Sequence, residues 1–129
     1  MAGKYLLDTN IVIALFEGAR SVVQRLGRAS QVFVPSITVG ELFYGAYQST
    51  HVQENLQRIE EFVAVNTVLA CDAATAELYG HVKSRLQSKG RSLPDNDIWI
   101  AALARQHGLT LVSRDVHFKE IERLRLEAW

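Results

Sequence analysis

The chain has 129 residues, and 48% of them are hydrophobic, which is enough for the core of one domain spanning residues 1–129. The 14 Lys and Arg residues balance the 14 Asp and Glu residues. Zero net charge argues against a uniformly basic nucleic-acid coat or an acidic tail, although local charged patches remain compatible with it. The single cysteine, Cys71, excludes an intrachain disulfide and any metal site built on paired cysteines.

Signals for membranes or export are missing from the sequence pattern. No run of residues approaches the roughly 20 apolar positions that cross a bilayer. Residues 1–7 contain neither a long apolar run nor a small-residue cleavage site, so a secretory signal is not expected. One unpaired cysteine is compatible with a reducing compartment. We therefore expect a cytoplasmic protein without a membrane partner.

Short apolar runs alternate with longer segments of helical spacing. Runs of mostly apolar or β-branched residues, typical of strands covered by helices on both faces, lie at 4–7, 31–34, 67–70 and 110–112, with a short candidate edge strand at 125–127. Two helices are expected in each of the three intervals between the first four runs, and only a short tail after the fourth. This order predicts an α/β fold, a three-layer α/β/α sandwich with a central parallel sheet of four to five strands.

Capping residues mark several helix boundaries. Ser36 is predicted to cap a helix that ends near Tyr47 and forms a hairpin with the next one, over 52–63. Asp72 is predicted to cap a helix that stops at Gly90. Asp95 or Asn96 is predicted to cap a last long helix that ends at Gly108, and the alanines at 101, 102 and 104 would let it lie close to the sheet.

Four acidic residues occupy positions where this type of fold places its ligands. Asp8 and Asp115 each follow a predicted strand, and ligands of open α/β sheets bind beyond the carboxyl ends of the strands. Asp97 lies in the first turn of its helix, and Glu41 is the only charge in an apolar stretch. Each has a structural alternative: Asp8 can cap a helix, Asp97 can complement a helix dipole, Asp115 can close a turn with Ser113, and Glu41 can be a partnered core charge.

The four carboxylates matter as a group, because close approach makes them repel one another. Two unit charges ~4 Å apart repel by about 4 kcal/mol at an effective dielectric constant of ~20. Either some carboxyls bind protons or a cation lies among them. Ligands that are all oxygen favour a hard ion, Mg²⁺ or Mn²⁺, and such an ion suits the hydrolysis of phosphate esters.

Other sites are disfavoured. The chain has no P-loop, no dinucleotide-binding glycine motif, no His-Glu-x-x-His and no Gly-x-Ser-x-Gly. The histidines at 51, 81, 107 and 117 are interpreted as solvated side chains. Cys71 is interpreted as a small core residue, and Tyr44 and Tyr47 as packing or interface residues.

The motifs resemble those of a known family. They are Leu-Leu-Asp8-Thr-Asn, Ser-Ile-Thr-Val-Gly-Glu41-Leu, Asn-Asp97-Ile-Trp-Ile-Ala-Ala and Leu-Val-Ser-Arg-Asp115-Val-His-Phe. In this order, over nearly the whole chain, they resemble the PIN-domain ribonucleases and most of all the VapC-type toxins of toxin–antitoxin pairs. The resemblance implies a PIN-like fold and an Mg²⁺- or Mn²⁺-dependent endoribonuclease. It also implies RNA as the substrate, a small antitoxin that holds the enzyme inactive, and a homodimer.

The resemblance also assigns roles to residues. Asp8, Glu41, Asp97 and Asp115 correspond to the acidic quartet that binds metal and carries catalysis. Thr9, Asn10 and Ser113 correspond to polar residues that support it. The presence of Asp95 leaves open which of Asp95 and Asp97 approaches the metal, and the motif Asp-x-x-Ile-Ala-Ala, which aligns on Asp97, favours Asp97. The implied reaction is in-line attack of an activated water on the RNA phosphodiester, leaving 5′-phosphate and 3′-hydroxyl ends. Asp8 and Asp97 would hold the main ion, and Asp115 and Glu41 would act through water or a second ion or orient the nucleophile.

Basic residues near these motifs are candidates for contact with RNA phosphates. Arg91 belongs to a basic cluster late in one helix and in the following loop, together with Lys83, Arg85 and Lys89. A solvated helix face explains that cluster equally well. Arg114, beside Asp115, is the second candidate.

Three other functions compete with the ribonuclease hypothesis. A non-catalytic binding or regulatory module on the same fold would be favoured by a missing acid, and none is missing. A phospho-acceptor receiver domain needs an adjacent acid pair after the first strand, whereas Asp8 is followed by Thr9 and Asn10. A flap-DNA nuclease needs insertions for which 129 residues leave little space.

Overall fold

A five-stranded parallel sheet forms the centre of the molecule. The computed structural model describes residues 3–129, so Met1 and Ala2, where the expected domain and the segment inspected for a signal begin, lie outside the described residues. The strands, in chain order, are β1 (Lys4–Leu7), β2 (Gln31–Pro35), β3 (Thr67–Leu69), β4 (Thr110–Val112) and β5 (Leu126–Glu127). Their order across the sheet is β3-β2-β1-β4-β5, and every pair is parallel.

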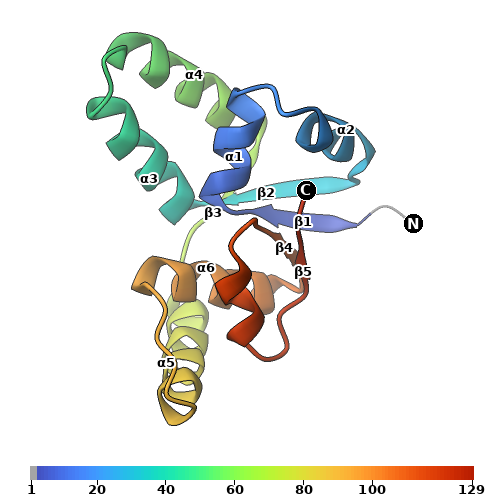
Figure 1. Cartoon of the computed structure of the whole chain (residues 1–129), viewed down its shortest axis with the longest axis vertical. Coiled ribbons are helices and arrows are strands. Elements are labelled where there is room, and N and C mark those ends of the chain that lie inside the picture. The colour runs from blue at the N-terminus through green and yellow to red at the C-terminus, as the bar shows by residue number, and fades with distance from the viewer. Residues whose placement is uncertain (1–2) are drawn as a thin grey trace.

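Helices cover both faces of this sheet, which confirms the predicted three-layer fold. They are α1 (Thr9–Phe16), α2 (Arg20–Arg28), α3 (Ser36–Tyr47), α4 (Val52–Val65), α5 (Ala73–Ser88), α6 (Asp95–His107) and a short 3₁₀-helix, η1 (Val116–Glu120). Figure 1 shows α1 to α4 on one side of the sheet and α5, α6 and η1 on the other. The predicted hairpin is present, since α3 and α4 pack against each other.

Alternation of side chains along the strands divides the core into two halves. Leu6 and its β4 neighbour Leu111 face the layer of α5, α6 and η1, where Phe118 is buried. Leu7 and its neighbour Val112 face the layer of α1 to α4. All four of these strand residues are fully buried, as expected when both faces of a parallel sheet are covered. Truncating a buried leucine such as Leu6 to alanine would cost about 2–5 kcal/mol of stability.

Two of the predicted helix starts are wrong by one residue or more. The residue at the N-cap of α3 is Pro35 rather than Ser36, and the N-cap of α6 is Pro94 rather than Asp95 or Asn96. Each proline has an extended backbone, and the residue after it is already helical, so neither start has a side-chain cap. The helices therefore begin directly after the proline.

The other predicted boundaries are confirmed. The Asp72 carboxylate accepts a hydrogen bond from the Thr75 backbone N–H at 3.0 Å, and the Thr75 hydroxyl accepts one from the Asp72 N–H at 3.0 Å, which completes a capping box. Gly90 and Gly108 follow α5 and α6 with φ angles of 69° and 64°, a left-handed conformation that glycine adopts without steric cost. The alanine-rich face of α6 is fully buried.

The carboxyl ends of β1 and β4 lie side by side and define the edge where ligands are expected. Leu7 pairs with Val112, so Asp8 and Ser113 follow at the same level of the sheet. The Asp8 N–H extends the ladder by donating to the Val112 carbonyl at 3.0 Å. The chain builds the sheet outward from β1 through β2 to β3, and it then returns to the other side of β1 to add β4 and β5. Ligands of open α/β sheets bind beyond the strand ends at such a reversal of strand order.

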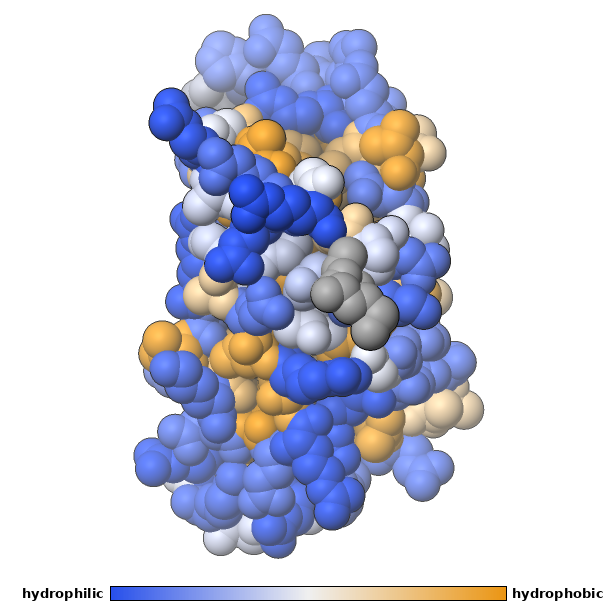
Figure 2. Space-filling view, turned by 90° about the vertical axis from the view of Figure 1, so that its right-hand side faces the viewer, coloured by the Kyte–Doolittle hydropathy of each residue, from blue (hydrophilic) through white to orange (hydrophobic). Residues whose placement is uncertain are grey.

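The surface of the described residues carries both hydrophilic and apolar side chains. Figure 2 shows the face on the right-hand side of Figure 1, where hydrophilic residues dominate the two ends and apolar residues appear in smaller groups between them. Ile13, Tyr44 and Tyr47 are large apolar or aromatic side chains that remain exposed. None of the helices in the described part of the chain is long and apolar enough to cross a bilayer.

Candidate active site at the carboxyl ends of the strands

Asp8 connects the end of β1 to the start of α1. It is 5% exposed, and its Oδ1 caps α1 by accepting a hydrogen bond from the Thr9 N–H at 2.9 Å. Its other oxygen, Oδ2, accepts the Ser113 hydroxyl at 2.7 Å and the Asn10 side-chain amide at 3.3 Å. The capping alternative is therefore confirmed, and because the same carboxylate stands at the carboxyl end of β1 beside Ser113, capping does not exclude a functional role.

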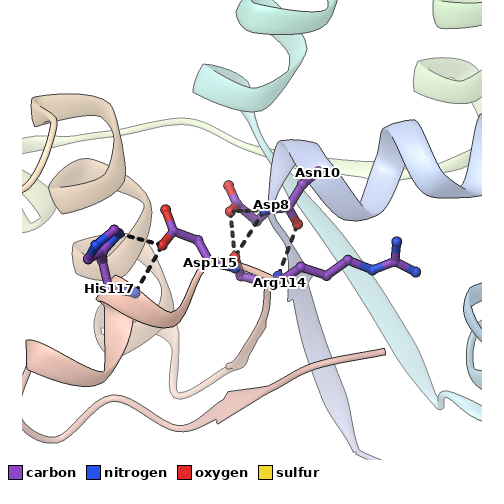
Figure 3. Close-up of polar contacts among 6 residues, drawn as sticks. Asp8, Asn10, Arg114, Asp115 and His117 are labelled. Carbon is purple, nitrogen blue, oxygen red and sulfur yellow. Dashed lines mark hydrogen bonds and ion pairs between the residues drawn. The ribbon is translucent and has the colours of Figure 1, made fainter.

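A polar network ties the loop after β4 to the beginning of α1. The Asn10 amide donates to the Ser113 hydroxyl at 3.3 Å, and its carbonyl oxygen accepts the Arg114 N–H at 3.1 Å. The Ser113 hydroxyl also accepts the Asp115 N–H at 3.0 Å. Figure 3 shows Asp8 and Asn10 of one segment facing the 113–115 segment. Asn10 and Ser113 thus fix the relative positions of the acids at 8 and 115.

Asp115 begins η1 and has a partner that the sequence interpretation did not assign to it. Its Oδ1 accepts the His117 backbone N–H at 2.9 Å, and the His117 ring Nδ1 lies 2.9 Å from the same oxygen. Figure 3 shows the Asp115 carboxylate between His117 and Asp8. The His117 side chain is 76% exposed, so it is solvated as predicted, but it also belongs to this site. The Asp-x-His spacing, which lets a carboxylate meet the second residue after it, is the signal that identifies this contact.

Glu41 approaches the site from α3 through a buried hydroxyl pair. The Thr9 hydroxyl donates to Glu41 Oε1 at 2.6 Å, and it lies 3.2 Å from the hydroxyl of Thr38. Thr38 is fully buried and was not among the predicted site residues. Its position one turn before Glu41, on the same face of α3, is the sequence signal that was available. The partner that a partly buried Glu41 was expected to have is therefore the hydroxyl of Thr9, and not a lysine or arginine side chain.

Asp97 and Asp95 lie in the same helical turn but in opposite environments. Burial raises the pKa of Asp97 to about 6, and repulsion from Asp8, Asp115 and Glu41 acts in the same direction. Asp95 instead accepts the Lys83 ammonium and the Tyr79 hydroxyl, each at 2.9 Å, and these hydrogen bonds lower its pKa. Of these two acids, Asp97 is therefore the one that feels the charges of Asp8, Glu41 and Asp115.

The same repulsion reaches Asp8. Burial is the main reason that the pKa of Asp8 is raised, and the charges of Glu41 and Asp115 contribute further. Hydrogen bonds from Ser113 and from the Thr9 N–H oppose this rise because they stabilise the ionised form. The acids from four separate segments therefore share one electrostatic environment.

The side chains do not form a closed ligand shell as they stand. Within residues 3–129, no three His, Cys, Asp or Glu side chains are close enough to hold one metal ion. Neither Asp8, Glu41 nor Asp97 forms an ion pair with any lysine or arginine of that range. The donors are all carboxylate and hydroxyl oxygens, and their charge is not neutralised. This combination fits a hard divalent cation such as Mg²⁺ or Mn²⁺.

The two arginines predicted to contact RNA are engaged elsewhere. The Arg114 side chain extends away from Asp8 and Asp115 in Figure 3, and its Nε donates to the Trp129 carbonyl at 3.1 Å. Arg91 forms an ion pair with Glu120 at 3.4 Å. Trp129 itself is buried and lies edge-to-face against Tyr5, with 5.0 Å between ring centroids. These contacts argue against a direct role of either arginine at the acids.

Comparison with known proteins agrees with this geometry. The family described as PIN domain matches residues 5–124. The chain is 40% identical to Ribonuclease VapC2 of Haemophilus influenzae over 98% of each chain. It is 36% identical to the tRNA(fMet)-specific endonuclease VapC of Shigella flexneri, also over 98% of each.

Solved structures give the same result for the fold. A crystal structure of VapBC2 from Rickettsia felis, bound to a DNA fragment from its promoter, contains a chain that superposes with a TM-score of 0.91 at 29% identity, covering 98% of both chains. DNA-bound VapBC from Salmonella typhimurium also gives a TM-score of 0.91, at 31% identity over 100% of this chain and 99% of that one.

Proposed function

The chain belongs to the PIN domain family, and from this premise we propose that it is an endoribonuclease toxin, dependent on Mg²⁺ or Mn²⁺, that a cognate antitoxin neutralises. The observation that carries the proposal is that acids from four segments lie near enough to repel one another, while no lysine or arginine of the described residues is paired with Asp8, Glu41 or Asp97. The relatives named above as ribonucleases and as members of VapBC complexes support the activity and the type of partner.

The proposed metal ligands follow from burial and position. Asp8 and Asp97 are the acids whose pKa is raised, so they gain most from a nearby positive charge, and we assign them to direct contact with the ion. Glu41 and Asp115 each have one oxygen engaged by a neighbour, and we assign them to contact through water, to a second ion, or to orienting the nucleophile. A divalent cation, when bound, supplies the charge that acidifies a water and offsets negative charge on the phosphate.

The remaining polar residues hold these acids in place. Ser113 and Asn10 fix one oxygen of Asp8, which leaves the rotation of that carboxylate little freedom. Thr9 does the same for Glu41. A carboxylate of the site accepts the proton of the attacking water, and attack by water leaves the RNA 2′-hydroxyl unused. The expected products therefore carry a 5′-phosphate and a 3′-hydroxyl.

An exposed apolar surface close to the acids supports a protein partner. A cavity of about 250 Å³ lies between α1, α3 and α4, and its lining includes Ile13, Phe16 and Glu41. Tyr44 and Tyr47 are 70% and 62% exposed on α3, so within this chain they do not serve as packing residues. Apolar surface next to a functional site is typical of an interface. We assign this apolar surface to the binding of the antitoxin. The homodimer and the cytoplasmic location expected from the sequence also belong to the proposal.

A cleavage assay on total RNA tests the activity. Purified protein is incubated with RNA in Mn²⁺, in excess EDTA, and in Mn²⁺ after mixing with its antitoxin, and the cut ends are mapped. We expect 5′-phosphate ends in Mn²⁺ alone. Cleavage that persists in EDTA would reject the metal dependence, and absence of cleavage in Mn²⁺ with retained antitoxin binding would favour the non-catalytic module instead.

A further inference from the structure

A second cavity, with a charged lining, lies at the C-terminal end of η1, whereas Asp115 of the acidic site caps its N-terminal end. It has a volume of about 370 Å³ and is bounded by α5, α6 and the segment before β5. Its charged lining consists of Arg85, Lys89, Arg105, Arg123, Glu120 and Glu122. Four cationic side chains against two carboxylates give it an excess of positive charge. None of these residues belongs to the acidic site, so the proposed ribonuclease chemistry leaves the cavity unexplained.

Both carboxylates of this cavity already have cationic partners. Glu122 pairs with Arg85 at 3.1 Å and with Lys89 at 3.6 Å. Glu120 pairs with Arg91 at 3.4 Å, and its carbonyl accepts the Lys89 ammonium at 2.9 Å. The hydrogen bonds and proximity of Arg85 and Lys89 lower the pKa of Glu122, so it is ionised and committed to them. Because both carboxylates of the cavity are already paired, they do not neutralise the remaining cations of its lining.

Arg105 and Arg123 are those remaining cations. Within residues 3–129 neither guanidinium has a hydrogen bond, an ion pair or a ring contact. Arg105 is half-buried on α6, where a charged group without a partner is unfavourable. Arg123 has a φ of 61°, and it is the only non-glycine residue of the described range with a positive φ. Backbone strain of this kind is often found where a loop binds a ligand.

We propose that this cavity binds a phosphate group through Arg105 and Arg123. The planar guanidinium offers paired donors that match phosphate oxygens, and two such groups, beside carboxylates already paired with other cations, are suited to a singly or doubly charged anion. A volume of about 370 Å³ has room for a phosphate together with part of the molecule that carries it.

The phosphate has two sources, and the proposed function favours one of them. Asp115 caps the start of η1, and Glu120 is its last residue. A five-residue 3₁₀-helix spans roughly 10 Å, so the cavity is within reach of an RNA strand that enters the acidic site. If the ribonuclease proposal holds, the cavity binds an RNA phosphate away from the one that is cleaved. A free molecule with a phosphate or diphosphate group is the other source.

An RNA-binding experiment distinguishes this site from a general basic surface. Asp97→Asn protein, which we expect not to cleave, is titrated with a labelled single-stranded oligoribonucleotide at 50 and 200 mM salt. We compare it with double variants that add Arg105→Gln, Arg123→Gly or Arg28→Gln. Arg28 is an exposed arginine on α2 and serves as the matched control. We expect affinity to fall about five- to tenfold for the first two, with a salt slope smaller by about one, and less than twofold for the control.

Arg123→Gly also controls for a loss of affinity that is caused only by unfolding. Glycine adopts positive φ freely, so Arg123→Gly removes the cation while relieving the backbone strain. Its melting temperature is expected to stay equal to that of the parent or to rise, even though its affinity for phosphate falls. Weaker binding by a protein that is no less stable cannot be attributed to unfolding.

Titration of inorganic pyrophosphate into the wild type in EDTA tests the second source. Binding that is lost in Arg105→Gln, without any effect on RNA affinity, supports the phosphate site with a free ligand. RNA affinity that falls with Arg105→Gln supports it with RNA. If Arg105→Gln equals Arg28→Gln in both titrations, the proposal is overturned. Cleavage by the wild type is measured separately, so this failure can be told apart from failure of the ribonuclease function.

Discussion

The carboxylates of the acidic site and those of the α5 face have opposite kinds of partner. On the α5 face, by which we mean the ion pairs made by Lys83, Arg85 and Lys89 of α5, Asp95 and Glu122 each have a cationic partner within 4 Å, and their pKa values are lowered. At the acidic site, Asp8 and Glu41 accept hydrogen bonds from hydroxyl, amide and backbone N–H groups rather than from lysine or arginine, and the pKa values of Asp8 and Asp97 are raised. Acids of the same chain are thus neutralised in one region and left uncompensated in the other.

This difference separates structural from functional acids more clearly than residue type does. A carboxylate paired with an exposed lysine adds little to stability and has no need of a ligand. A half-buried carboxylate that repels its neighbours destabilises the folded protein unless a ligand relieves the repulsion. Such carboxylates are typical of functional sites. Asp95 and Asp97 make the contrast sharpest, because the same helical turn carries both. They therefore form a matched pair for experiments.

The largest expected effect is on cleavage. Asp97→Asn removes a proposed metal ligand and should reduce RNA cleavage in Mn²⁺ at least about 100-fold, because even residues that only support a ligand cost about 10–100-fold. Asp95→Asn should change cleavage less than about twofold, since its effects are confined to exposed contacts with Lys83 and Tyr79, away from the other acids. Initial rates on a defined oligoribonucleotide measure both. Equal losses in the two variants would contradict the assignment of Asp97 to the site.

Ser113→Ala should have the next largest effect. It removes the 2.7 Å hydrogen bond to Asp8 and the acceptor of the Asp115 N–H, so two acids lose their orientation. We expect a loss of about 10–100-fold in cleavage and a matching loss of Mn²⁺ affinity measured by calorimetry. Ser88→Ala, which removes an exposed hydroxyl contact of 2.7 Å to the Arg85 carbonyl, is the control and should leave both unchanged. Unchanged Mn²⁺ affinity in Ser113→Ala would show that Asp8 does not depend on this hydroxyl.

Much of this arrangement could be predicted from the sequence, and the exceptions have physical reasons. The strand runs, the glycine stops and the acids after β1 and β4 were accessible because each depends on local composition or on the common direction of parallel strands. The start of α3 at Ser36 was assigned to a cap because serine is a good capping residue, yet Pro35 already fixes the backbone there.

Contacts between distant segments were not accessible in this way. Arg114 and Arg91 resembled phosphate-binding residues because of their neighbours in sequence, whereas their partners, Trp129 and Glu120, are 15 and 29 positions away along the chain. Thr38 and His117 looked unremarkable because their roles depend on Thr9 and Asp115 being placed beside them. The choice of Asp97 over Asp95 was made from the family motif and stays a prediction, which the ion pair of Asp95 with Lys83 and the raised pKa of Asp97 favour.

Stability in the absence of metal gives a smaller effect with a characteristic pH dependence. The pKa of Asp97 rises from its ordinary value of 3.8 to about 6 on folding. Well below pH 3.8 the residue is protonated in both states, and the difference in pKa costs nothing. As the pH rises from 3.8 to about 6, the unfolded chain ionises Asp97 while the folded protein keeps it protonated, so stability falls, and the loss is complete above pH 6. In EDTA, Asp97→Asn should therefore raise the melting temperature by about 1–4 °C at pH 7.5, and this gain should vanish near pH 3.

Asp95→Asn is the control for this measurement, and the opposite sign is expected. Its pKa is lowered by Lys83, so ionised Asp95 is favourable in the folded state above pH 4, and that contribution is lost in the variant. The melting temperature of Asp95→Asn at pH 7.5 should be slightly lower than that of the wild type. A decrease in both variants would mean that the helix dipole, which both acids complement, outweighs the repulsion at Asp97.

The smallest expected effect concerns the paired acids at the edge of the second cavity. Glu122→Gln breaks exposed ion pairs with Arg85 and Lys89, which should lower the melting temperature slightly at low salt and not at all at 0.5 M salt, where screening is strong. The same change frees two more cations beside Arg105, so pyrophosphate should bind more tightly to Glu122→Gln than to the wild type at low salt. Thermal melts and calorimetry measure these two quantities on one sample. Tighter binding by a slightly less stable protein would show that the carboxylate opposes the anion, whereas unchanged binding would place the phosphate away from Glu122.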